Sequence, residues 1–97
     1  MWVKVHKSSR VVIAICDENL LGKKFEEGIR QLEVRESFFK GDQMSKKEVL
    51  DLIKRGVAAG STFNIVGKES INCALECEIT EESLVHKIKG IPFAIIV

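Results

Sequence analysis

The first sixteen residues carry two different hydrophobic patterns. Residues 2–6 alternate, with Val3 and Val5 between polar or aromatic neighbours, as in a strand with two unlike faces. Residues 11–16 are continuously apolar and rich in β-branched side chains, which is typical of a strand buried on both faces. Because only a short serine-containing turn separates the two segments, we predict an antiparallel hairpin with residues 11–16 at the centre of a sheet.

The strongest helical signal begins at Ser45. Ser45 and Glu48 have the spacing of a capping box, in which each side chain binds the other residue's backbone N–H. Gly60 is well placed to end this helix in a left-handed conformation. The apolar residues between them recur at helical spacing and form one stripe: Val49, Leu52, Ile53 and Val57.

Weaker patterns complete the prediction. Residues 17–28 contain two glycines and predict a short helical turn, whereas the alternation over residues 29–37 predicts a third strand with one solvated face. The wholly apolar residues 93–97 predict an inner strand of the same sheet or part of an oligomer interface. The other predicted elements are a short strand or connector at 62–66, a second helix at 68–77, a helical turn near Thr80, and strands at 84–88 and 91–97.

Length and composition limit the fold. A chain of 97 residues has room for one modest hydrophobic core, so we predict a single domain over residues 1–97. Apolar residues make up 45% and charged residues 30%, which is ordinary for a globular protein and excludes a disordered tail. The predicted fold class is α+β, with a small mixed, mainly antiparallel sheet and two helices packed on it.

The sequence predicts a cytoplasmic protein without a membrane partner. Its longest apolar runs, residues 11–16 and 91–97, are far shorter than the roughly twenty residues of a membrane-spanning helix. Lysine and arginine residues interrupt the first ten residues, so no signal peptide is predicted. An odd number of cysteines, three, favours reduced thiols over a disulfide framework.

Charge is balanced overall but uneven along the chain. The chain has fifteen Lys and Arg residues and fourteen Asp and Glu residues, and this near balance argues against a generic nucleic-acid binder. Residues 1–16, however, hold three cations and no acid, and residues 44–60 hold four cations against two acids. Two such regions can form a phosphate-binding patch, although solvated strand edges and a solvated helix face are the commoner explanation. The candidate RNA-binding residues are Trp2, Lys4, Lys7, Arg10, Lys46, Lys47, Lys54 and Arg55.

Catalytic and metal chemistry find weaker support. Cys16 ends the predicted central strand, where ligand sites gather, but Asp17 beside it tends to raise a thiol pKa, so a packed thiol is expected. Cys73 and Cys77 share a helical face, but zinc motifs normally carry paired cysteines on a turn at closer spacing. We therefore predict no catalytic residue, no metal and no cofactor.

Three stretches of the chain together resemble a known archaeal family. They are residues 1–5 (MWVKV), residues 16–23 with Phe25 and Gly28 after them, and residues 64–67 with Gly90-Ile91-Pro92 near the end. The chain resembles the small archaeal proteins classed as domain of unknown function 424. This resemblance implies an archaeal, cytoplasmic, single-domain α+β protein and supplies no functional residue. A His is expected shortly after the Gly-x-Pro of the family's last strand, whereas Phe93 stands here, which counts mildly against an enzyme.

Three functions remain open on these patterns. The leading hypothesis is a non-enzymatic binding module that acts with an RNA or ribonucleoprotein partner in translation, through the basic residues named above. The rival is a protein–protein interaction subunit or a homo-oligomer, formed through the apolar C-terminal strand. A small enzyme that uses Cys16 as its nucleophile is the third.

Overall fold

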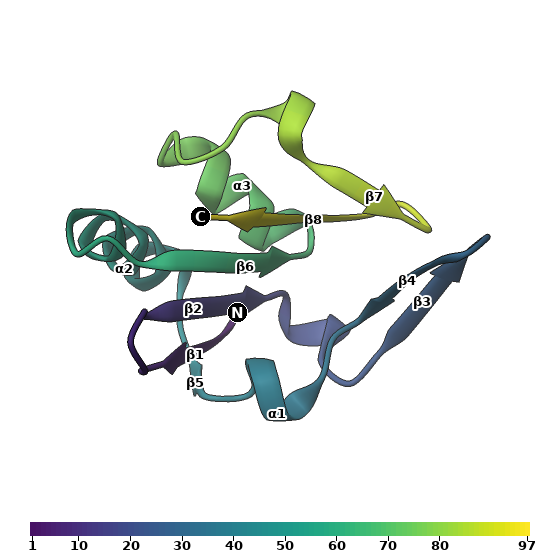
Figure 1. Cartoon of the computed structure of the whole chain (residues 1–97), viewed down its shortest axis with the longest axis horizontal. Helices are drawn as coiled ribbons and strands as arrows, with labels where there is room; N and C mark the ends of the chain where they lie inside the picture. The colour runs from purple at the N-terminus through teal and green to yellow at the C-terminus, as the bar shows by residue number, and fades with distance from the viewer.

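The computed structural model describes residues 1–97 and is organised around one sheet (Figure 1). The strands are β1 (Trp2–His6), β2 (Val12–Cys16), β3 (Lys24–Glu27), β4 (Arg30–Glu33), β5 (Asp42–Gln43), β6 (Thr62–Val66), β7 (His86–Ile88) and β8 (Ile91–Ile96). The helices are α1 (Glu36–Phe39), α2 (Lys46–Ala58) and α3 (Lys68–Glu76), with 3-10 turns η1 (Glu18–Leu20) and η2 (Glu82–Leu84). Six strands form the main sheet in the order β5-β1-β2-β6-β8-β7, and β3 pairs with β4 alone.

The sheet is mixed and mainly antiparallel, as predicted. β1 and β2 form the expected antiparallel hairpin, in which Trp2 lies opposite Cys16 and His6 opposite Val12. β2 and β6 are parallel neighbours at the centre of the sheet, while β8 runs antiparallel to both β6 and β7. The fold class α+β is confirmed, with three helices on the sheet instead of two because the short α1 was not predicted.

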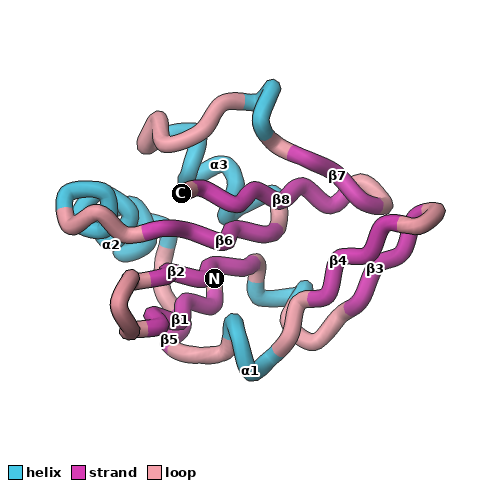
Figure 2. Tube along the Cα trace, in the orientation of Figure 1, coloured by secondary structure: helices cyan, strands magenta, loops and turns pink.

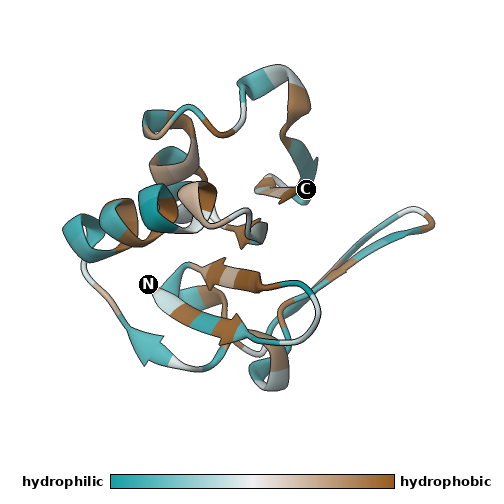
Figure 3. Cartoon of the chain, turned by 60° about the vertical axis from the view of Figure 1, so that its left-hand side comes forward, coloured by the Kyte–Doolittle hydropathy of each residue, from teal (hydrophilic) through white to brown (hydrophobic).

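Each face of the sheet has its own hydrophobic cluster. α2 and α3 cover one face, where Val49, Ile53 and Ile71 join residues of the central strands. η1, α1 and the β3–β4 hairpin lie on the other face and bury a second cluster around Ala14 and Cys16. β2 is therefore enclosed from both sides, which confirms the prediction for residues 11–16; Figure 3 shows β2 almost wholly hydrophobic beside the alternating β1.

α2 forms as its sequence predicts. Ser45 Oγ accepts a hydrogen bond from the Glu48 N–H at 3.3 Å, and Glu48 Oε1 accepts one from the Ser45 N–H at 3.0 Å. These bonds lower the pKa of the Glu48 carboxyl, since they favour its ionised form. Gly60 takes φ +76° just beyond the helix, as expected.

None of the helices has both the length and the apolar composition of a membrane-spanning segment.

The region of residues 24–39 differs from its prediction. The strand predicted over residues 29–37 is limited to β4, and it pairs with the unpredicted β3 in a hairpin that projects beside the main sheet (Figure 2). Residues 36–39 form α1, in which the Phe38 and Phe39 rings lie edge to face, with centroids 5.2 Å apart. Adjacent side chains of a strand point to opposite faces, so the helical turn is what allows both rings to cover the sheet.

The C-terminal strand lies inside the sheet. β8 is hydrogen-bonded between β6 and β7, which confirms the prediction of an inner strand. Its neighbour β7 starts at His86, later than the predicted Leu84, because Leu84 belongs to η2. Although β8 is an inner strand, Ile95 remains 69% exposed on the face that carries α1.

A carboxylate joins the end of β2 to the start of α3. Asp17 Oδ1 accepts hydrogen bonds from the Ser70 N–H and the Ser70 hydroxyl, both at 2.8 Å, and Asp17 Oδ2 accepts one from the Glu69 N–H at 3.2 Å. The carboxylate thus caps α3 from a distant part of the chain. Gly67, with φ +107°, precedes the helix, and a Cβ atom there would overlap the Asp17 carboxyl group.

Replacing Gly67 with Ala is expected to lower the free energy of unfolding by about 3 kcal/mol, because strain at positive φ adds to displacement of the Asp17 carboxylate. Gly60→Ala is the matched control, since Gly60 has φ +76° and open space around it. Its expected cost is about 1 kcal/mol. Urea unfolding followed by circular dichroism measures both values, and equal losses would show that the carboxylate contact adds nothing.

Candidate functional site

The eight predicted RNA-binding residues fall in three separate places. Trp2 and Lys4 lie on β1 and face α1, whereas the four residues of α2 lie over the opposite face of the sheet. Lys7 and Arg10 lie in the turn between β1 and β2. The structure therefore does not bring all eight residues together on one surface.

The residues of β1 interact with α1 and the segment that follows it. Lys4 Nζ donates a hydrogen bond to the backbone oxygen of Ser37 at 2.8 Å. The Lys40 ammonium lies 5.8 Å from the centroid of the Trp2 ring. The His6 ring stacks on Phe38 with centroids 4.5 Å apart, which places an imidazole and a phenyl ring on this side of the sheet.

A second set of cations belongs to two segments at one end of the sheet. We call Lys7, Arg10, Lys54 and Arg55 the basic end. The β1–β2 turn and the end of α2 both lie at this end, because the Thr62 N–H, at the start of β6, donates to the Val11 carbonyl at 2.9 Å. In Figure 1 both lie on the left of the molecule.

The side chains of the basic end are exposed and unpaired. The only ion pairs in the structure within 4.0 Å are Lys24–Glu26, Arg35–Glu33 and Lys46–Glu76. Lys46 is thus paired at 3.3 Å, and Lys47 is exposed at the opposite end of α2. The basic end therefore holds the largest group of predicted cations with no carboxylate partner.

The carboxyl ends of β2 and β6 do not offer a free anion site. Open α/β sheets commonly bind ligands at this position, where a helix N-terminus supplies N–H donors. Here Asp17 already accepts from the first turn of α3. No local pattern predicts this contact, because Asp17 and Ser70 are 53 residues apart; its only signals in the sequence are an acid after a strand and a glycine before a helix.

Cys16 has the properties of a packed thiol. It has no exposed surface, and burial, reinforced by the neighbouring Asp17, raises its pKa to about 12, while the N-terminal ammonium opposes the change. A nucleophilic cysteine needs the opposite shift, toward the thiolate at neutral pH. The enzyme hypothesis therefore gains no support from this residue.

The other two cysteines contact different groups. Cys73 Sγ lies 4.0 Å from Met1 Sδ, whereas Cys77 Sγ lies 3.8 Å from the backbone oxygen of Leu50. Burial raises the pKa of both thiols. No group of three or more His, Cys, Asp or Glu residues in the structure is arranged to hold a metal ion.

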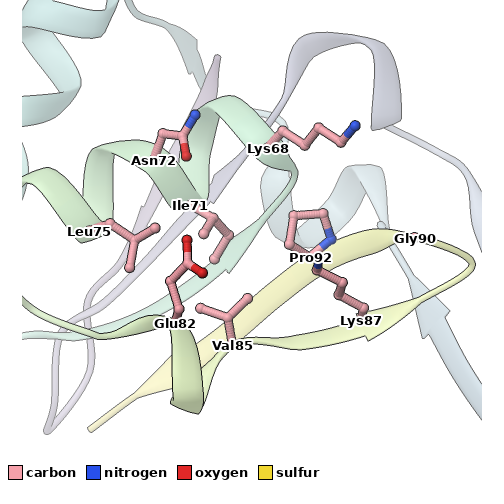
Figure 4. A pocket seen from close by; sticks show the side chains of 9 residues that line it. All are labelled: Lys68, Ile71, Asn72, Leu75, Glu82, Val85, Lys87, Gly90 and Pro92. Atoms are coloured by element: carbon pink, nitrogen blue, oxygen red, sulfur yellow. The ribbon is translucent and has the colours of Figure 1, made fainter.

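A pocket opens between α3 and the segment that leads into β7 (Figure 4). Its volume is about 260 Å³, and Ile71, Leu75, Val85 and Pro92 form its apolar wall. Glu82 extends from η2 toward α3, and Lys68, Asn72 and Lys87 complete the lining. No ion pair joins these charged side chains, and two lysines against one glutamate leave the rim mildly positive.

A second hollow lies on the opposite face of the sheet, and we call it the sheet groove. Its volume is about 270 Å³, and eight of its eleven lining residues are hydrophobic. Phe38 comes from α1 and Leu32 from β4, while Asn64, Phe93 and Ile95 come from the central strands. The groove exists because α1 and the β3–β4 hairpin cover only part of this face, and no local sequence pattern indicates how far they extend over it.

Native thiol reactivity is expected to separate the three cysteines. At pH 8 a thiol reagent should modify the half-buried Cys77 first, since Cys16 and Cys73 are buried. Cys16 should react only as fast as the protein unfolds, because its raised pKa keeps it protonated. Mass spectrometry of timed samples measures this order, with Cys77→Ser as the control that removes the fast phase. Rapid native modification of Cys16 would contradict it.

One solved structure shows the same fold. The crystal structure of an uncharacterized conserved protein from Methanopyrus kandleri superposes with a TM-score of 0.87 at 23% sequence identity, and the match covers 98% of this chain and 88% of that chain. At this identity the likeness concerns the fold. A comparison with curated proteins gives no match.

The family comparison agrees with the resemblance seen in the sequence. The family model described as Protein of unknown function (DUF424) matches residues 6–97. This range includes every element from β2 to β8, the sheet groove and the basic end. The chain therefore belongs to the DUF424 family of proteins of unknown function.

Proposed function

We propose that this protein is a cytoplasmic, non-enzymatic binding module that acts with RNA or a ribonucleoprotein in translation. The observation that carries the proposal is the basic end, where four exposed cations from two distant segments have no carboxylate partner. Unpaired cations of this kind can bind phosphates without first breaking an ion pair. The archaeal source of the similar crystal structure supports an archaeal origin for this chain as well.

The charge balance suggests how such a module would gain specificity. A net charge of +1 gives little long-range attraction for nucleic acid, so non-specific binding would be weak. Contacts at the basic end would instead act together with the shape of the RNA or with a second protein. This behaviour suits a component of a larger ribonucleoprotein better than a protein that coats RNA.

A second candidate is a protein-binding subunit or homo-oligomer, and exposed apolar side chains favour it. Leu84 is 58% exposed, Ile95 69% and Val97 91%. Clustered apolar surface of this kind marks interaction sites. Because β8 is an inner strand, the partner would contact its side chains and could not extend the sheet from its edge.

Lys7→Ala/Arg10→Ala is expected to weaken binding of single-stranded RNA and to flatten its salt dependence. Loss of two phosphate contacts should reduce the slope of log K against log salt by about 1.4. Fluorescence anisotropy at rising salt measures this slope. The control is Lys23→Ala/Lys68→Ala, whose residues are exposed toward the opposite end of the sheet and which also lowers the net charge by two. Equal slopes for the two variants would contradict the proposal that the basic end binds RNA.

Two variants, Ile95→Lys and Val97→Lys, together separate the two candidate functions. Since Ile95 is 69% exposed, the new ammonium is solvated, and the melting temperature should change by no more than about 3 °C. If β8 binds a protein or a second copy, light scattering after size exclusion should show a wild-type complex that the variant loses. RNA affinity is measured on Val97→Lys instead, because Ile95 lines the sheet groove whereas Val97 is 91% exposed and does not line it. That variant adds a cation, so its RNA affinity should hold or rise. A wild-type monomer at all concentrations contradicts self-association.

A further inference from the structure

Asn64 occupies an unusual position. It lies in the middle of β6, a central strand, where asparagine is disfavoured and a β-branched residue fits better. None of the side-chain hydrogen bonds in the protein involves its carboxamide. No buried side-chain polar atom lacks a partner, so the polar atoms of Asn64 touch solvent. The carboxamide therefore contributes no hydrogen bond to the stability of the fold.

The carboxamide opens into the sheet groove. Asn64 lies between Ala14 on β2 and Ile95 on β8, in one row across the sheet. Half-buried Phe38 and Phe93 line the same hollow of about 270 Å³. His86 lies against Phe93, with ring centroids 5.7 Å apart. A free amide with aromatic rings beside it suits a flat, polar, heteroaromatic group.

We infer that the sheet groove binds an unpaired nucleobase of single-stranded RNA. This inference rests on the proposed function and names the form of RNA that the module takes. The base stacks on the ring of Phe38 or Phe93, and its polar edge pairs with the donor and acceptor of the Asn64 carboxamide. A base inside a duplex has neither its faces nor this edge free, so the groove selects single strands.

The surroundings of the groove are compatible with a phosphate backbone. Glu33, the acid that lines it, is paired with Arg35 at 3.1 Å, which offsets its charge. Arg30 lies beside Phe93 and Ile95 in an adjoining hollow. Asn64 lies two residues, about 7 Å, along β6 from Thr62, whose N–H donates to the carbonyl of Val11, the residue after Arg10. A strand with one base in the groove can thus extend its phosphates to Lys7 and Arg10.

The test compares Asn64→Val with Asn72→Ala. Valine suits a central strand, so Asn64→Val should unfold at the wild-type temperature or higher. It should bind short single-stranded oligoribonucleotides about tenfold more weakly, with an unchanged salt slope and unchanged affinity for duplex RNA. Asn72 is an exposed asparagine on α3, across the sheet from the groove, and Asn72→Ala should bind like the wild type. Phe93→Leu provides a second variant, with the same expected loss.

The outcomes separate this inference from the proposed function. If Lys7→Ala/Arg10→Ala weakens binding but Asn64→Val does not, the groove is rejected and the basic end stands. NMR titration with adenosine monophosphate tests the groove by itself, because saturable shifts of the Asn64 side-chain amide signals support it whatever the basic end does. Absence of such shifts, or groove signals that respond only to protein concentration, would overturn the inference and favour a protein-docking surface.

Discussion

The contact between the Asp17 carboxylate and the first turn of α3 fixes the centre of this molecule. It ties the end of β2 to the helix that follows β6, so the two parallel central strands and α3 hold one arrangement. The carboxylate also satisfies backbone donors that helix N-termini otherwise leave free. The carboxylate thus occupies the position where a sheet with helices most often binds an anion. A ligand of this protein must therefore bind at another surface.

Those surfaces arise because the two faces of the sheet are covered unequally. α2 and α3 lie over one face and bury their apolar sides against it. The other face is covered only by short pieces, η1, α1 and the β3–β4 hairpin, which reach Ala14 and Cys16 but stop short of Ile95. Side chains that a complete second layer would bury, Asn64 and Phe93 among them, therefore stay open to a ligand. The sheet groove is a direct result of this incomplete layer.

Sequence patterns predicted the elements whose signals are local. The continuous apolar run before Asp17 and the Ser45–Glu48 capping box each specify one element without outside help, and the structure has both. The prediction for residues 24–39 was wrong, because alternation alone does not show where a strand ends or that Phe38 and Phe39 lie in a helical turn. The predicted RNA-binding cations lie on different surfaces of the structure. A period-two pattern shows that Lys4 and Val3 point to opposite faces of β1, but it does not show which of those faces a later helix covers. The Asp17 contact joins segments too distant for any spacing rule.

The parallel pairing of β2 with β6 has a consequence for how the chain folds. The β1–β2 hairpin closes a short loop, but Val12 must find Thr62, 50 positions further on, before the core exists. Pairing of such distant segments loses loop-closure entropy before any strand contact stabilises the chain, and this slows folding. Until α2 and β6 pack against β2, Ile13 and Ile15 stay exposed to solvent. During that interval the nascent molecule is most exposed to aggregation, and folding speed depends on how readily the capped α2 forms.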